Sequence, residues 1–111
     1  MEFTLLLWGS QDGESSLSRE ERREIVERHI AFGRRLRDEG AHVYAAPLDD
    51  AAAGRVVRGE LVTDGPFTET KEQLGGLYVI RCDSFDEAVE WARQVPGSPG
   101  LVVEVRANPD V

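Results

Sequence analysis

The sequence predicts a single α+β domain in which two helices cover one face of an antiparallel sheet. Hydrophobic spacing alternates between strand-like and helix-like segments, in the order strand, helix, strand, hairpin, strand, helix, strand. Each helical segment opens with a capping box, Ser18-x-x-Glu21 in one and Ser84-x-x-Glu87 in the other. A length of 111 residues, with 41% hydrophobic and 31% charged residues, corresponds to one globular domain spanning residues 1–111.

The first half of the chain contains two expected strands, one on either side of the first helix. In order, the segments are a strand Phe3 to Gly9, a polar loop Ser10 to Ser16, a helix from Ser18 to about Asp38 or Glu39, and a strand His42 to Leu48 broken at Pro47. Gly40 ends the helix, because glycine readily adopts the left-handed conformation that follows a last helical turn. Apolar residues occupy both faces of the first strand, which predicts a central strand buried on both sides.

The second half begins with a small-residue loop and a tight hairpin. The expected segments are a loop Asp49 to Gly54, hairpin strands Arg55 to Arg58 and Leu61 to Asp64 around Gly59-Glu60, a strand Gly76 to Cys82, a helix from Ser84 to about Val95, and a strand Leu101 to Arg106. Pro96-Gly97 ends the second helix. Two strand–helix–strand halves with an inserted β-hairpin predict a ferredoxin-like α+β sandwich.

A ferredoxin-like sheet has one face that its own helices leave uncovered. Leu6, Trp8 and alternate residues of the later strands would form an apolar patch on that face. Two sheets packed face to face would bury both patches, so we expect a symmetric homodimer.

Charge and composition exclude several classes of partner. With 13 basic and 21 acidic residues the net charge is −8, which argues against binding to a nucleic-acid backbone. The arginines between positions 19 and 28 alternate with glutamates and therefore predict a solvated helix face. No segment has the length of a membrane span or the pattern of a signal peptide, so we expect a cytoplasmic protein without a membrane partner.

Cysteine and histidine are too few to predict a disulfide or a metal centre. Cys82 is the single cysteine, and its place in an apolar run predicts a buried, unreactive thiol. The two histidines, His29 and His42, have no short-range ligating partner. We therefore predict neither a bound metal nor a cofactor.

The segment from Asp64 to Gly76 concentrates turn residues and charges where a plain connection would suffice. Its Asp-Gly-Pro start predicts a bend, and its Gly-Gly end would let two backbones approach closely. The charged side chains Glu69, Lys71 and Glu72 either frame this loop or, in the case of Lys71, contact an anionic substrate.

In the first helix, His29 lies inside the apolar stripe that includes Ile25 and Phe32. It is either a pocket group that moves protons, because imidazole titrates near neutral pH, or a half-buried histidine bonded to the backbone. Asp64 is either the carboxylate partner of His29 or a turn residue that bonds its own following backbone. A carboxylate within about 4–6 Å would raise the pKa of His29.

Several motifs together resemble one protein family. They are Leu-Leu-Leu-Trp-Gly near the start, His29-x-x-Phe32, the run Asp64-Gly65-Pro66-Phe67 followed by Glu69, Lys71-Glu72 and Gly75-Gly76, then Asp83-Ser84-Phe85-Asp86-Glu87-Ala88 and Val103-Glu104-Val105-Arg106. On these motifs, the chain resembles the DGPF-domain group of the YCII-related family over nearly its whole length. The resemblance implies a dimeric ferredoxin-like α+β barrel with a small pocket in each subunit.

The resemblance also implies a site and a second type of function. Relatives pair a histidine of the first helix with an aspartate, and these correspond here to His29 and Asp64 as catalytic candidates. Phe67 and Lys71, in the same motif, are the candidate substrate-binding residues. Some members occur beside or fused to sigma factors, which implies a regulatory alternative in transcription.

Three functions are consistent with these observations. The first is an enzyme of lyase, isomerase or dehydrohalogenase type, in which His29 moves a proton and Asp64 orients the imidazole. The second is a non-catalytic ligand-binding or regulatory module that acts with a transcription factor, and the third is a dimerisation domain without a ligand. We expect a small-molecule pocket for a compact organic acid or phenolic ring, and the first function requires both side chains at that pocket.

Overall fold

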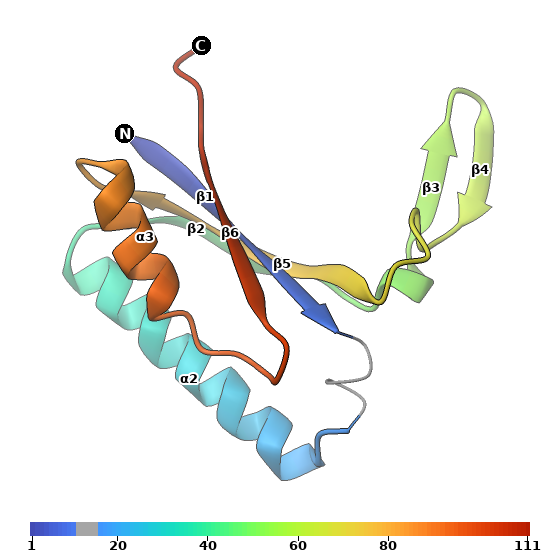
Figure 1. Ribbon diagram of the computed structural model, residues 1–111, viewed down its shortest axis with the longest axis horizontal. Coiled ribbons are helices and arrows are strands. Elements are labelled where there is room, and N and C mark those ends of the chain that lie inside the picture. The colour runs from blue at the N-terminus through green and yellow to red at the C-terminus, as the bar shows by residue number, and fades with distance from the viewer. Residues whose placement is uncertain (11–15) are drawn as a thin grey trace.

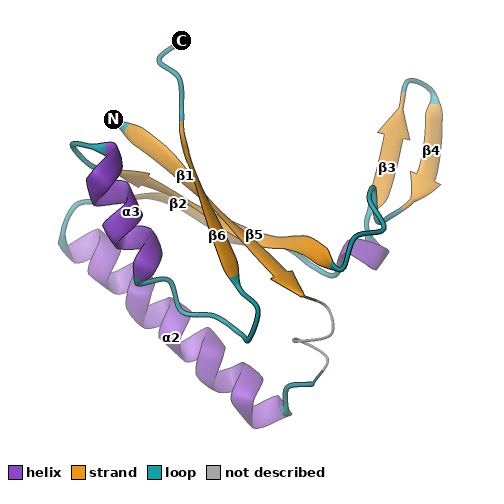
Figure 2. Ribbon diagram, viewed as in Figure 1, coloured by secondary structure: helices purple, strands orange, loops and turns teal. Residues whose placement is uncertain are grey.

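The computed structural model describes residues 1–10 and 16–111, and Figures 1 and 2 show its helices and strands. Its elements are β1 (Glu2–Ser10), α2 (Arg19–Asp38), β2 (His42–Pro47), the 3₁₀ turn η1 (Ala51–Ala53), β3 (Arg55–Arg58), β4 (Leu61–Asp64), β5 (Glu72–Arg81), α3 (Phe85–Arg93) and β6 (Val102–Ala107). Most of the polar loop predicted after the first strand, residues 11–15, lies outside the described residues.

Four strands form one antiparallel sheet in the order β2-β5-β1-β6, and β3 pairs with β4 in a separate hairpin. Both helices lie against the same face of the sheet (Figure 1). The α+β class predicted from the sequence, with two helices and an antiparallel sheet, is confirmed. The strand order is compatible with a ferredoxin-like arrangement.

The core lies between the helices and the side chains that the sheet turns toward them. Phe3, Leu5 and Ile80 of the strands are buried together with Phe32 and Leu36 of α2. On the opposite face of β1, alternate side chains such as Leu6 and Trp8 are only half-buried. The prediction that this strand is buried on both sides is therefore wrong for the single chain, because within the described residues the helices cover one face only.

Strand β5 begins at Glu72, four residues before the start predicted at Gly76. The additional residues pair with the end of β1, where Trp8 lies opposite Leu74, and the register shift at this point passes over Gly75. Because this part of the strand contains charged and glycine residues, its sequence lacks the hydrophobic pattern that predicts a strand. It is a strand because the far end of β1 supplies its hydrogen-bonding partners.

Gly76 brings the backbone of β5 close to the backbone of β2. A Cβ atom at this position would lie 3.1 Å from the carbonyl oxygen of Ala46, so a larger residue would push the two strands apart. The close approach predicted from the Gly-Gly pair is confirmed at this position.

Two shorter segments and one side chain also differ in detail from the predictions. The loop predicted from Asp49 to Gly54 contains η1, whose first turn is capped when the Asp50 carboxylate accepts a hydrogen bond from the backbone N–H of Ala52. Helix α3 ends at Arg93, although Val95 beyond its end is still buried.

Cys82, predicted to be buried, is half-buried. Its thiol contacts the carbonyl oxygen of Ser84 at 3.4 Å, and burial raises the pKa of the thiol.

The hairpin β3–β4, called the arm below, stands away from the sheet on the side opposite the helices (Figure 1). Its apolar side chains Val57, Leu61 and Val62 are exposed, and so is Phe67 in the segment that follows. The radius of gyration is 15.2 Å, whereas a compact domain of this length would have about 13 Å. The arm is thus an extension whose apolar surface the single chain leaves uncovered.

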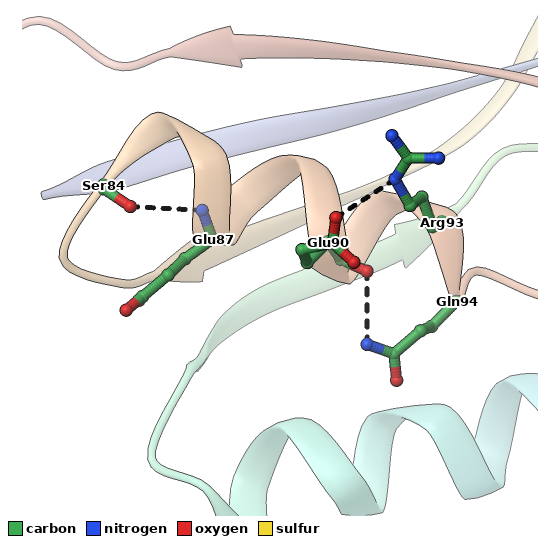
Figure 3. Close-up of polar contacts among 5 residues, drawn as sticks. All are labelled: Ser84, Glu87, Glu90, Arg93 and Gln94. Carbon is green, nitrogen blue, oxygen red and sulfur yellow. Dashed lines mark hydrogen bonds and ion pairs between the residues drawn. The ribbon is translucent and has the colours of Figure 1, made fainter.

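The helix starts follow the predicted capping pattern, with one difference. At α2 the box is complete, since Ser18 Oγ accepts from the Glu21 N–H at 3.1 Å and the Glu21 carboxylate accepts from the Ser18 N–H at 3.0 Å. At α3, Ser84 Oγ accepts from the Glu87 N–H at 3.1 Å (Figure 3), but the Glu87 carboxylate accepts from the N–H of Asp83 instead of Ser84. Neither described helix combines the length and the apolarity that a membrane crossing requires.

The end of α3 is tied to its own last turn and to α2. Gln94 donates through Nε2 to the carbonyl oxygen of Glu90 at 3.1 Å, and Arg93 lies 3.2 Å from the Glu90 carboxylate (Figure 3). The Gln94 side-chain oxygen also accepts from Arg35 of α2, whose guanidinium lies 5.9 Å from the ring centroid of Trp91. These contacts hold the two helices together above the sheet.

The cap of α3 yields a test of local stability. We predict that Ser84→Ala lowers the free energy of unfolding by about 1 kcal/mol, because the first turn loses a hydrogen-bond acceptor. Ser84→Asn, which keeps a capping oxygen, should lose much less. Urea unfolding followed by circular dichroism measures both, and equal losses in the two variants would show that the cap contributes nothing.

Candidate ligand cavity around His29

A cavity of about 710 Å³ opens between the first half of α2, the ends of β1 and β5, and the segments that precede η1 and β6. Much of its wall is apolar and includes Leu7, Ile25, Val26, Leu48, Leu74 and Leu101. Its polar side chains are Arg22, His29, Asp49, Asp50, Gln73 and Ser98. A cavity of this size, whose wall combines apolar side chains with polar groups, has the dimensions of a small-molecule site.

His29 is held at this cavity by its position on α2 and by one buried partner. The core packing of Phe32 and Leu36 turns this face of the helix toward the sheet, where Tyr78 of β5 points inward beside Ile80. The Nδ1 atom of His29 lies 2.6 Å from the hydroxyl oxygen of Tyr78. The two rings are stacked, with centroids 5.9 Å apart and planes inclined by 13°.

Tyr78 is itself fixed by the core. Its side chain is 7% exposed, and its ring meets the ring of Phe32 edge to face at a centroid distance of 5.1 Å. Packing on this side leaves the phenol little freedom to move, so its hydroxyl has a defined position. The imidazole of His29 is therefore oriented by the Tyr78 hydroxyl, and Nε2 is the ring nitrogen that this contact does not use.

Burial sets the direction in which the pKa values of His29 and Tyr78 shift. It lowers the pKa of His29 below its ordinary value, because removal from water disfavours the charged imidazolium. It raises the pKa of the Tyr78 phenol for the same reason, since phenolate is the charged form. At neutral pH the pair consists of a neutral imidazole and a neutral phenol.

Asp64, the predicted partner of His29, lies elsewhere in the single chain. It ends β4 on the arm, opposite Arg55, and is exposed. It is not among the residues that line the cavity. The raised pKa of His29 that the pairing would produce is likewise not found, because burial is what shifts that pKa and it acts downward.

The two predicted substrate-binding residues also lie outside the His29 cavity. Phe67 is 68% exposed, and its ring centroid is 5.3 Å from the guanidinium carbon of Arg58 on the arm. Lys71 lines a shallow depression together with Trp8 and Val102, which belong to the uncovered face of the sheet. The four predicted site residues thus occupy three separate places, and His29 alone lies in the cavity.

Sequence reasoning missed the residues that surround His29. In the sequence, Tyr78 is one apolar position of a predicted strand, and no local pattern links position 78 to position 29. Asp49 and Asp50 read as loop residues, although they line the cavity. The apolar stripe of the first helix is the sequence signal for this site, because it predicts that the His29 side chain faces the sheet. Among the described residues, no three histidine, cysteine or carboxylate side chains gather in a way that could hold a metal ion.

Comparisons with known proteins place the chain in a family. The family model of the YCII-related domain matches residues 1–107. The chain is also similar to an uncharacterised protein of Rhizobium meliloti (strain 1021), with 36% identity over 99 residues that cover 86% of this chain and 80% of that protein. The resemblance seen in the motifs is thereby confirmed, and the chain belongs to the YCII-related domain family.

Proposed function

We propose that this protein binds a compact small molecule in the cavity around His29 and uses the imidazole in acid–base chemistry of the lyase or isomerase type. The observation that carries the proposal is the anchored histidine. His29 lines a cavity of mixed polarity, and the hydroxyl of the buried Tyr78, 2.6 Å from Nδ1, fixes its ring. A catalytic imidazole requires such an orienting partner, which holds the ring in place while its other nitrogen contacts the substrate.

The wall of the cavity suits a small compound that has both an apolar body and polar groups. Side chains such as Leu48 and Leu101 would pack against the body of the ligand. Polar groups lie at several points of the wall, which allows the ligand to be oriented as well as buried.

A ligand screen tests this proposal with the second histidine as a control. A compound that binds the cavity should raise the melting temperature, because a ligand at 100 times its dissociation constant stabilises the native state by about 2.7 kcal/mol. We expect the shift to persist in His42→Gln, since His42 lies on β2 outside the cavity lining, and to be lost or strongly reduced in His29→Gln. A shift of full size in His29→Gln would favour the non-catalytic binding module.

The proposal includes a symmetric dimer of the α+β barrel type, built by pairing the uncovered faces of two sheets. That face presents the apolar residues Leu6, Trp8, Leu77 and Val79, all half-buried, and the exposed Tyr44 and Val102. The arm stands on the same side (Figure 1), so a second sheet packed on this face would also meet the arm. Burying both surfaces in one interface explains why they are apolar.

Two matched variants test the dimer. Val102 on the uncovered face and Ile30 on α2 are 50% and 51% exposed, so a lysine at either site costs the single chain little. We predict that Val102→Lys shifts the protein from dimer to monomer in sedimentation or gel filtration, because it would bury a charge in the interface. Ile30→Lys should remain a dimer. If the wild-type protein is a monomer, the proposed assembly is wrong.

We retain Asp64 as a candidate partner of His29 in the dimer only, where the arm belongs to an interface. If the partner's arm brings a carboxylate to His29, the pKa of His29 should be lower in Asp64→Asn than in the wild-type dimer, because a nearby negative charge favours imidazolium. Histidine titration by NMR measures this difference, with Asp83→Asn near the start of α3 as a control. Identical titrations in all three proteins would remove Asp64 from the site.

A further inference from the structure

We propose that Tyr78 holds His29 in the neutral form that is protonated on Nε2, so that His29 offers a hydrogen-bond donor to a carbonyl-type oxygen of the ligand. Tyr78 is in this sense a positioning residue, which acts through His29 without touching the ligand. The ligand part of the inference rests on the proposed function, whereas the state of the His29–Tyr78 pair does not.

The direction of the hydrogen bond follows from the needs of the buried hydroxyl. The Tyr78 side chain is 7% exposed, and among the described residues His29 Nδ1 is the partner that its hydroxyl has. A buried O–H that donates to nothing is costly, whereas a phenol oxygen that donates its proton and accepts none is common. The hydroxyl therefore donates to Nδ1. An imidazole nitrogen accepts only when it carries no proton, so the proton of neutral His29 is on Nε2.

The same contact opposes protonation of His29. Imidazolium carries protons on both nitrogens, so the Tyr78 hydroxyl would have to accept from Nδ1 and its own proton would lose this acceptor. Burial acts in the same direction on His29, and it also keeps the phenol protonated and able to donate. Among the described residues, the charged side chains that line the cavity are Arg22 from the helix and the Asp49–Asp50 pair from the loop before η1, which oppose one another in sign.

A neutral imidazole with Nε2–H selects ligands by their acceptor atoms. A carbonyl, ester or nitro oxygen would receive the hydrogen bond while the rest of the molecule packs against the apolar wall. A protonated Nε2 cannot accept a proton, so in this state His29 assists proton abstraction next to a carbonyl as a donor that polarises the carbonyl without adding a charge to the site. An ammonium group, which can only donate, would face the N–H without forming a bond.

Long-range ¹H–¹⁵N correlation spectra of the histidine rings test the pair directly. In the wild-type protein at neutral pH, we expect His29 to show an unprotonated Nδ1 and a protonated Nε2. Tyr78→Phe should raise the pKa of His29, because the neutral form loses its hydrogen bond, and should release the second tautomer. His42, read in the same spectra, should not change. A wild-type His29 protonated on Nδ1 would overturn the inference, and this reading does not depend on whether the variant folds.

A pair of probes tests the ligand class. Acetophenone and ethylbenzene have similar size and shape, but only the first offers a carbonyl oxygen. In NMR titrations we expect acetophenone to bind about fivefold more tightly, as one hydrogen bond allows, and this preference should vanish in His29→Ala. Equal affinities in the wild-type protein would refute the donor role of His29. If neither probe binds, the ligand part of this inference is wrong, whereas the tautomer spectra decide the state of the His29–Tyr78 pair and the ligand screen decides the proposed function.

Discussion

The packing of α2 across strands β1 and β5 is the constraint on which the rest of this structure depends. Phe32 and Leu36 enter the core with Phe3, Leu5 and Ile80, and this contact sets the rotation of the helix about its axis. Because His29 lies one turn before Phe32, the same rotation brings its ring against Tyr78. The candidate site is thus a direct consequence of the core, in which a polar pair occupies the border between the apolar interior and the cavity.

The neutral pair of His29 and Tyr78 differs from the charged pair expected for a catalytic histidine. A carboxylate partner would stabilise imidazolium and favour a general base, whereas a buried phenol stabilises neutral imidazole. The position of the pair at the edge of the core explains why the partner of His29 is a phenol and not a carboxylate. A carboxylate buried there would need a compensating charge, while a phenol adds apolar area and satisfies its hydroxyl with one hydrogen bond.

The arm and the uncovered face of the sheet present the opposite situation, in which apolar residues have no partner within the described chain. Val57, Leu61 and Val62 lie on an isolated two-stranded hairpin, and such hairpins have little stability alone. Asp64 and Phe67 lie on or next to this arm, away from the cavity. Within the single chain, the Asp64-Gly65-Pro66-Phe67 motif and the cavity are therefore separate.

The sequence by itself determined the α+β class, the hairpin and both helix starts, because capping residues and hydrophobic spacing act over a few neighbouring positions. It also directed His29 toward the sheet through the helical stripe. Only the tertiary structure decided that Tyr78, and not Asp64, meets His29 in the single chain, and that β5 begins at Glu72. Both outcomes depend on strand register and on helix rotation, which result from contacts between distant segments and leave no local pattern.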